Sequence, residues 1–185
     1  MEDISLVKDN IMEKEDYSGD SREHKDDGMS DDVTLYLTFL LGSDLFGIPV
    51  NSVREVIEYK KVFKTPRVPD YIKGVINLRG EVVPIIDLTS RFYNNKSEII
   101  NTSAIVVVEI SENSHKIPIG VIIDSVKAVV DIGVDKIDST PDIGSRIKPE
   151  YLDGIGKVDN EFVILLNIDA ILNIEELSGF EDNNN

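Results

Sequence analysis

Short apolar runs separated by turn-forming residues fill most of the chain between residues 35 and 167. Several runs alternate apolar and polar positions, whereas residues 104–110 are almost wholly apolar. The first pattern is typical of half-buried strands and the second of strands that are buried on both faces. Strands are predicted at residues 35–41, 46–50, 53–57, 74–79, 82–87, 104–110, 117–123, 126–130, 155–158 and 162–167. Short helices are predicted at residues 88–92 and 168–177, so the pattern indicates a mainly β fold.

Two blocks of sequence occur twice, in the same order. Residues 46–53 (FGIPVNSV) return as residues 119–126 (IGVIIDSV), and residues 69–75 (PDYIKGV) return as residues 149–155 (PEYLDGI). A duplication of this kind predicts two similar β units, with function where the two copies differ. About five strands per copy, separated by Gly, Pro and Asn, suggest two small antiparallel barrels. We predict a first barrel at about 46–92 and a second at about 104–172, with the strand 35–41 shared at their junction.

The barrels together form one predicted domain, residues 33–177, flanked by two tails. Residues 1–32 hold 12 acidic and 4 basic side chains, and residues 178–185 form a short polar end. A charged segment with few apolar residues is expected to be disordered. A solubility leader is the favoured interpretation of residues 1–32. The alternative is a docking peptide built on its aliphatic residues, which are Ile4, Leu6, Val7, Ile11 and Met12.

Composition excludes several classes of protein. A net charge of −16 opposes binding to nucleic acid and to an anionic membrane surface. The chain has no cysteine, which rules out disulfides and thiolate metal sites. No stretch approaches the roughly 20 apolar residues that span a bilayer, and the first residues lack the features of a signal peptide. We therefore expect a cytoplasmic protein without direct membrane insertion.

The sequence offers little support for catalysis. Its two histidines, His24 and His115, lie in polar surroundings without a nucleophile motif or a metal-binding spacing. No glycine-rich loop that could hold a phosphate is present. We predict no catalytic residue, no metal site and no cofactor.

Superposing the two copies shows where they differ. Glu55 falls opposite Ala128, and Arg79 falls opposite Asp159, so only the first copy carries an acid and a base at these places. If the halves fold alike, Glu55 and Arg79 lie on neighbouring elements. An exposed pair adds only about 0–1 kcal/mol to stability, and most such pairs have no further role. A guanidinium can nevertheless fix how a partner docks, because its five donors form a rigid fork.

The block at residues 74–88, GVINLRGEVVPIIDL, resembles the signature of the CheW family of chemotaxis coupling proteins. Supporting motifs lie on both sides, and the resemblance covers about residues 33–177. It implies two five-stranded SH3-like β subdomains with short helices and a groove between them. Pro49 departs from the family pattern, and because proline lacks an amide donor its strand is expected at a sheet edge or at a bulge. Thr89 also departs, since a basic residue is common there.

The resemblance also implies function. Members of this family are non-enzymatic adaptors that couple methyl-accepting chemoreceptors to the histidine kinase CheA, whose regulatory domain has the same fold. The expected protein is a monomer that joins receptor arrays at the inner face of the membrane. An apolar surface with charges at its rim would grip the receptor helices. The receptor-binding positions carried over by motif are Val53, Glu55, Gly74, Arg79, Val126 and Val129, and Gly120 marks the kinase-binding side.

Two alternatives remain open at this point. The chain could be a coupling module of another chemosensory-type histidine-kinase pathway. It could also belong to a different class, that of small β-barrel ligand-binding proteins or enzymes. The second alternative requires a deep pocket with converging polar groups.

Overall fold

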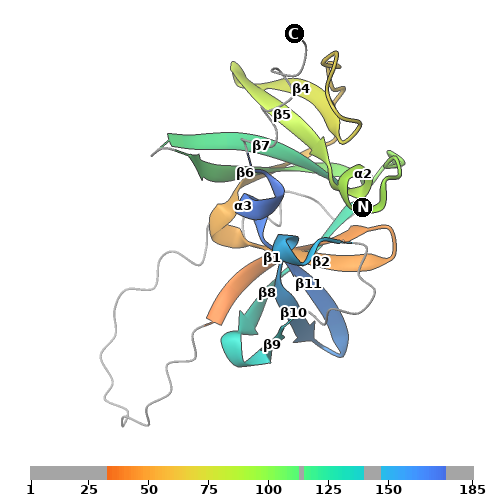
Figure 1. The fold of residues 1–185 in the computed structure, drawn as a ribbon. Helices are drawn as coiled ribbons and strands as arrows, with labels where there is room; N and C mark the ends of the chain where they lie inside the picture. The colour runs from red at the N-terminus through yellow and green to blue at the C-terminus, as the bar shows by residue number, and fades with distance from the viewer. Residues whose placement is uncertain (1–32, 113–114, 140–146, 174–185) are drawn as a thin grey trace.

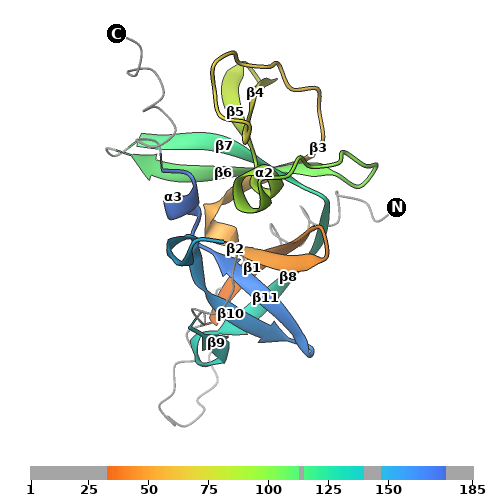
Figure 2. The same cartoon turned by 45° about the vertical axis from the view of Figure 1, so that its right-hand side comes forward.

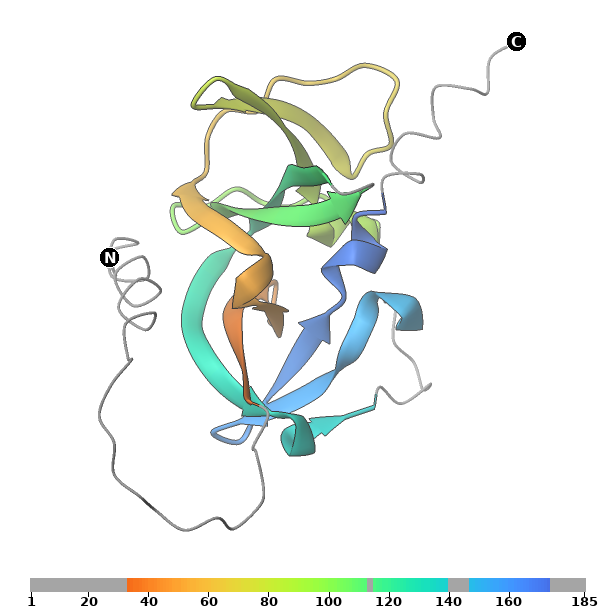
Figure 3. The same ribbon diagram turned by 90° about the vertical axis from the view of Figure 1, so that its left-hand side faces the viewer.

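The computed structural model describes residues 33–112, 115–139 and 147–173. Figures 1, 2 and 3 show this part of the chain as two β sheets, one above the other, with two short helices beside them. The strands are β1 (Val33–Leu41), β2 (Asp44–Pro49), β3 (Val53–Glu58), β4 (Ile72–Leu78), β5 (Glu81–Asp87), β6 (Ala104–Glu112), β7 (His115–Ile123), β8 (Ser125–Gly133), β9 (Ile137–Asp138), β10 (Leu152–Val158) and β11 (Glu161–Leu166). The helices are α2 (Leu88–Tyr93) and α3 (Ile168–Ile171), with 3₁₀ turns η2 (Val50–Ser52), η3 (Val134–Lys136) and η4 (Pro149–Tyr151). The mainly β prediction is confirmed.

The strands form two sheets with the same internal order. Sheet A runs β8-β1-β2-β11-β10-β9, and sheet B runs β3-β6-β7-β5-β4. Replacing each strand of the first repeat by its counterpart in the second turns one order into the other, with β9 added at the edge of sheet A. Both sheets contain one parallel contact, between β2 and β11 and between β7 and β5. The duplication seen in the sequence is therefore a duplication of topology.

The two repeats exchange strands, which the sequence did not predict. The first hairpin of repeat one, β1–β2, lies in sheet A with strands of repeat two, and the hairpin β6–β7 of repeat two lies in sheet B. The chain changes sheets at η2 and at Asp124, within the two echoed motifs at residues 46–53 and 119–126. Sheet membership therefore does not follow the predicted barrels at 46–92 and 104–172. The physical reason is that β2 and β7 find parallel partners in the other repeat instead of continuing straight into β3 and β8.

Pro49 does not mark an edge strand. β2 lies between β1 and β11, but its pairing with β11 involves only Phe46 and Gly47. The missing amide of Pro49 therefore falls beyond the part of β2 that is bonded on both sides. Pro49 thus lies where β2 is paired on one side only, at a local edge of a central strand, and the continuous register with β1 shows no bulge there.

One large core joins the two sheets. Its buried residues come from β1, β2, β3, β5, β6, β7 and β11 and from both helices, and its centre includes Phe39, Phe46 and Phe92. The rings of Phe39 and Phe46 stack with centroids 6.1 Å apart, and Phe46 lies 5.9 Å from Phe92. Burial of this size is the main stabilising contribution in a fold with so little helix.

Several predictions fall partly outside the described residues. The leader at 1–32 and the tail at 178–185 lie there, so both stay predictions, as do the limits of the whole domain. Helix α3 is described from Ile168 to Ile171, shorter than the predicted 168–177, and residues 174–177 are outside the described range. Among the described residues, none of the helices has the length and apolar character needed to cross a bilayer.

Candidate functional site

Glu55 and Arg79 form an ion pair, as the comparison of the two copies predicted. The distance from Nη2 of Arg79 to Oε2 of Glu55 is 3.1 Å. The Arg79 side chain is 70% exposed, whereas the Glu55 side chain is only 7% exposed. The solvent-facing group of this pair is therefore the guanidinium, held in place by a largely buried carboxylate.

The tight turn between β4 and β5 presents Arg79 to solvent. Arg79 and Gly80 both have positive φ, 52° and 90°, which is the conformation of a two-residue hairpin turn. The side chain of Asn77 accepts a hydrogen bond from the amide of Gly80 at 3.0 Å and closes this turn. At the matching place in repeat two, Asp159 and Asn160 have φ of 46° and 70°. The backbone conformation is thus shared by both repeats, whereas the side chain at the tip changes from basic Arg79 to acidic Asp159.

Ion pairs also close sheet B on itself. β3 and β4 are the two ends of this sheet, yet Glu55 on β3 reaches the β4–β5 turn. Beside it, Nη1 of Arg54 lies 2.8 Å from Oε2 of Glu81 at the start of β5. These contacts require sheet B to curl until its two end strands meet, as in a barrel, although its strands come from both of the predicted barrels.

The sequence reasoning missed Arg54 and the network around it. The Nε atom of Arg54 lies 4.0 Å from Glu109, and Lys116 lies 3.0 Å from the same carboxylate group. Arg54 is the extra residue of a bulge, because Val53 and Glu55 face consecutive residues of β6. Repeat two carries a basic residue, Lys127, at the same place, and it is the extra residue of the equivalent bulge between β1 and β8. This repeated basic residue was the sequence signal that could have pointed to Arg54.

The three predicted valines lie on matching strands of different sheets. Val53 begins β3 and faces Val108, whereas Val126 and Val129 lie on β8 and face Phe39 and Leu37. All three valines are half-buried. They pack against the large core that the two sheets share. The structure therefore brings the valines to one common core, and their contact with a partner stays a prediction.

Gly74 is buried and acts through its backbone. It has φ of +133°, and a Cβ atom there would collide with the carbonyl group of Phe63. Phe63 and Val75 exchange two backbone hydrogen bonds of 2.9 Å across this point. Gly74 thus allows the chain between β3 and β4 to pass directly beside β4. As a candidate receptor-binding position, it positions this segment and offers little surface of its own.

Gly120 is also buried. It lies on β7 opposite Ile85 and Val107, and a Cβ atom there would collide with the side chain of Ile85 and come within 2.8 Å of Ile105. This close approach allows β7 to be packed between β6 and β5. The assignment of Gly120 to the kinase-binding side stays a prediction, and any contact there must come from neighbouring side chains.

A second feature that the sequence reasoning missed joins the repeats near α2. The guanidinium of Arg91 lies 4.5 Å from the ring centre of Tyr71 and 5.1 Å from that of Tyr151. Its Nη2 also donates to the hydroxyl of Tyr151 at 2.9 Å. The two tyrosines occupy the same place in the echoed blocks at 69–75 and 149–155, and the cation between them links the repeats.

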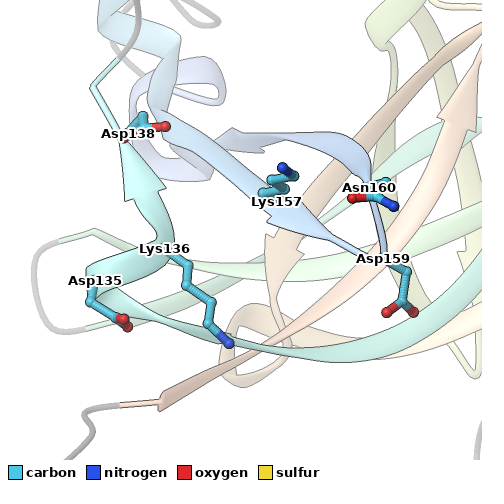
Figure 4. Close-up of a pocket in the computed structure, with 6 residues that line it drawn as sticks. All are labelled: Asp135, Lys136, Asp138, Lys157, Asp159 and Asn160. Carbon is cyan, nitrogen blue, oxygen red and sulfur yellow. The ribbon is translucent and has the colours of Figure 1, made fainter.

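Figure 4 shows a pocket of about 570 Å³ on sheet A, formed around η3, β9 and the β10–β11 turn. The residues that line it are all exposed: Asp135, Lys136, Asp138, Lys157, Asp159 and Asn160. Figure 4 shows the polar ends of Lys136 and Asp159 lying apart at the rim, not aimed at one point. A hollow of this kind lacks the apolar lining and converging groups of a small-molecule site.

The part of the chain that the structure describes contains no group of three or more His, Cys, Asp or Glu side chains that could hold a metal ion. The pocket and the ion pair at Glu55 lie on different sheets.

Comparisons with known proteins agree with the geometry. The profile of the CheW-like domain family matches residues 35–176. The "Chemotaxis protein CheW" of Klebsiella aerogenes is 32% identical, covering 77% of this chain and 84% of that protein. The protein of the same name from Treponema pallidum is 28% identical, covering 87% of this chain and 96% of that protein. The crystal structure of the scaffolding protein TtCheW from Thermoanaerobacter tengcongensis is similar, with a TM-score of 0.66, 31% identity, and coverage of 80% of this chain and 91% of that chain.

Proposed function

The chain belongs to the CheW-like domain family, and from this premise we propose that it is a non-enzymatic scaffold of bacterial chemotaxis. In the finer form of the proposal, it couples methyl-accepting chemoreceptors to the histidine kinase CheA. The observation that carries this proposal is the match over residues 35–176 together with relatives and a solved neighbour that bear the CheW name.

The geometry supports a contact surface around β3 and the β4–β5 turn. An exposed guanidinium at Arg79 stands on a buried carboxylate at Glu55, and a half-buried valine, Val53, begins the same strand. Apolar groups with a fixed charge at the rim are the features by which a groove recognises a helix and sets its register. We assign the receptor to this surface and to Val126 and Val129 of β8.

The kinase is assigned to the strands around Gly120. Because the regulatory domain of CheA is expected to have the same fold, exposed positions near the ends of the two sheets are suited to pair with it. The protein would act in the cytoplasm, bound to receptor arrays at the inner face of the membrane.

A binding experiment tests this proposal directly. The full chain is titrated separately with the regulatory domain of the cognate CheA and with a cytoplasmic fragment of the receptor, and a three-component mixture is sedimented. We expect each partner to bind and the kinase to sediment with receptor only when the chain is present. Absence of binding to both partners would leave the alternative of a module for another histidine-kinase pathway.

A further inference from the structure

The segment between β3 and β4 carries a basic cluster in an otherwise acidic chain. Residues 60–67 contain four basic side chains and no acidic one, although the whole chain has 35 acidic and 19 basic residues. These side chains are all exposed, and none of them forms an ion pair with another described residue. They are Lys60, Lys61, Lys64 and Arg67. We refer to residues 60–67 as the basic loop.

An exposed aromatic ring lies in the middle of the basic loop. Phe63 is 65% exposed, yet its backbone is fixed by the two hydrogen bonds of 2.9 Å to Val75. The ring is therefore exposed to solvent while its backbone is fixed, and Lys61 and Lys64 lie on either side of it in the sequence. A surface with these properties suits a segment that combines carboxylates with aliphatic side chains.

The first half of the leader has this composition. Residues 1–16 contain six acidic and two basic side chains, a net charge of −4, while the basic loop carries four positive charges. The isoleucine, leucine and valine residues of the leader all fall within residues 1–16. Residues 17–32 have the same net charge but none of these aliphatic side chains. Residues 1–16 therefore match the basic loop in both charge and apolar character.

The leader is long enough to reach the basic loop. It joins the fold at Val33, and Figures 1 and 3 place the start of β1 and the β3–β4 segment at opposite ends of the molecule. The link between residues 1–16 and Val33 is residues 17–32. A random-coil chain of 16 residues has a typical end-to-end distance of about 22 Å and a fully extended length of about 55 Å. An extended link can thus carry residues 1–16 across the molecule, and covalent attachment raises their local concentration, although to less than the mM range of a link whose relaxed length matches the span.

Other polyanions are poorer candidates for this surface. A nucleic acid or an anionic membrane would meet the net charge of −16 of the whole molecule, which repels it at long range. The leader is already attached to the molecule, so it escapes this cost of approach.

We propose that residues 1–16 dock in cis on the basic loop, with carboxylates facing the four basic side chains and aliphatic residues against Phe63. Because Phe63 pairs with the backbone next to Gly74, the docked leader lies beside the candidate site. Any effect of the docked leader on partner binding rests on the proposed function, whereas the docking itself does not.

The absence of native cysteine allows a direct distance measurement on the full chain. Spin labels are attached to S5C in the leader and T65C in the basic loop, and their distance distribution is measured at about 20 mM and about 500 mM salt. Exposed charge pairs weaken as the screening length shortens. We expect a population of short distances at low salt that decreases at high salt.

Two variants with the same net charge of −20 isolate the basic loop. In the first, Lys60, Lys61, Lys64 and Arg67 are replaced by Gln. In the second, four exposed lysines elsewhere are replaced by Gln: Lys96, Lys127, Lys136 and Lys157. Loss of four exposed charge pairs is expected to reduce the short-distance population about fivefold or more in the first variant and to leave it unchanged in the second.

The proposal is overturned if the native pair shows no short distances at low salt, or if both variants lose them equally. It is also overturned if the short distances disappear when labelled protein is diluted with unlabelled protein, since the leader of a second copy would then occupy the basic loop. Partner-binding assays do not enter this test, so its failure and the failure of the proposed function are distinguishable.

Discussion

The ammonium group of Lys73 lies 2.9 Å from Oδ2 of Asp87, a carboxylate that is completely buried. Asp87 also caps α2, because its Oδ1 accepts a hydrogen bond of 3.0 Å from the amide of Ser90. In repeat two the matching residues are Asp153 and Asn167, and Nδ2 of Asn167 donates to Oδ1 of Asp153 at 2.9 Å. Asn167 caps α3 in the same way as Asp87 caps α2. The repeats therefore place a lysine–carboxylate pair and a carboxylate–amide pair at one shared position.

The pair from repeat two is expected to function in repeat one. Lys73→Asp would place two carboxylates together, one of them buried, and lower the free energy of unfolding by about 2–3 kcal/mol. Adding Asp87→Asn recreates the arrangement of Asp153 and Asn167 and should restore about half of that loss or more. Urea denaturation monitored by circular dichroism measures both changes.

Lys116→Asp provides the control for this experiment. Lys116 pairs with Glu109 at 3.0 Å, but its side chain is 71% exposed, so its replacement should change the free energy of unfolding by less than about 1 kcal/mol. If the double variant is no more stable than Lys73→Asp alone, the two pairs are not interchangeable and the equivalence is wrong.

The same carboxylate predicts a dependence of stability on pH. Burial by itself raises the pKa of Asp87, but hydrogen bonds from Ser97, Lys73 and the backbone amides of Ser90 and Ser97 outweigh burial and hold the pKa below its ordinary value of 3.8. A group whose pKa is lower in the folded state stabilises the protein above the unfolded pKa and loses this effect as pH falls through the folded pKa. The native chain should thus lose more stability than Asp87→Asn below about pH 4. Urea titrations at intervals from pH 6 to pH 3 test this, and equal losses in both proteins would contradict it.

The sequence predicted the repeats but not the exchange of strands between them. Echoed residues and apolar alternation locate β2, β3, β7 and β8 within a few residues. Alternation reports which face of a strand is buried and does not report where the chain goes after a bend. At η2 and at Asp124 the chain enters the other sheet, and this step depends on the parallel pairing of β2 and β7 with strands far along the chain.

Differences between the two copies predicted one part of the candidate site and missed the rest. Glu55 and Arg79 stood out because their counterparts are Ala128 and Asp159, and the structure places them in contact. Arg91 did not stand out, since its partners are repeated tyrosines that read as ordinary core residues. The basic loop was also missed, because the loops between the echoed blocks differ in length and cannot be aligned residue by residue, and because its value depends on exposure.

Replacement of Gly74 should show that this position is structural. Gly74 and Gly80 both have positive φ, but a Cβ atom at Gly74 collides with backbone whereas one at Gly80 meets nothing within 4 Å. Gly80→Ala therefore carries only the cost of backbone strain, about 1 kcal/mol. Gly74→Ala should cost about 3 kcal/mol or more and expose the amide of Val75 to faster hydrogen exchange. If urea denaturation gives the same loss in free energy of unfolding for both variants, the backbone at Gly74 can shift to accept a Cβ atom and the collision has no energetic effect.

Reversal of the charge at Arg79 tests the rim of the proposed receptor surface. Arg79→Glu should weaken binding of the receptor fragment by about 2 kcal/mol, because it removes the guanidinium that fixes docking and adds a second carboxylate beside Glu55. Lys116→Glu is the matched control, because Lys116 has nearly the same exposure, 71% against 70%, and also pairs with a glutamate. Isothermal titration calorimetry measures both variants. A similar loss in both would mean that overall charge, not this position, governs binding.

Val53→Asp tests the apolar part of the same surface. Val53 is half-buried at the start of β3, so a carboxylate there would have to be desolvated when the partner covers it. We expect binding of the receptor fragment to weaken by about 2 kcal/mol, roughly 30-fold in Kd.

Val134→Asp is the control, since Val134 is 60% exposed on η3, far from β3 in the chain. The affinity of this variant for the receptor fragment should be unchanged. Val53→Ala is measured in the same experiment. It should lose affinity and keep its fold, because removal of the two methyl groups reduces the contact area without adding a charge. If Val53→Ala and Val53→Asp, both shown to be folded by circular dichroism, bind as tightly as the native chain, the receptor does not contact β3.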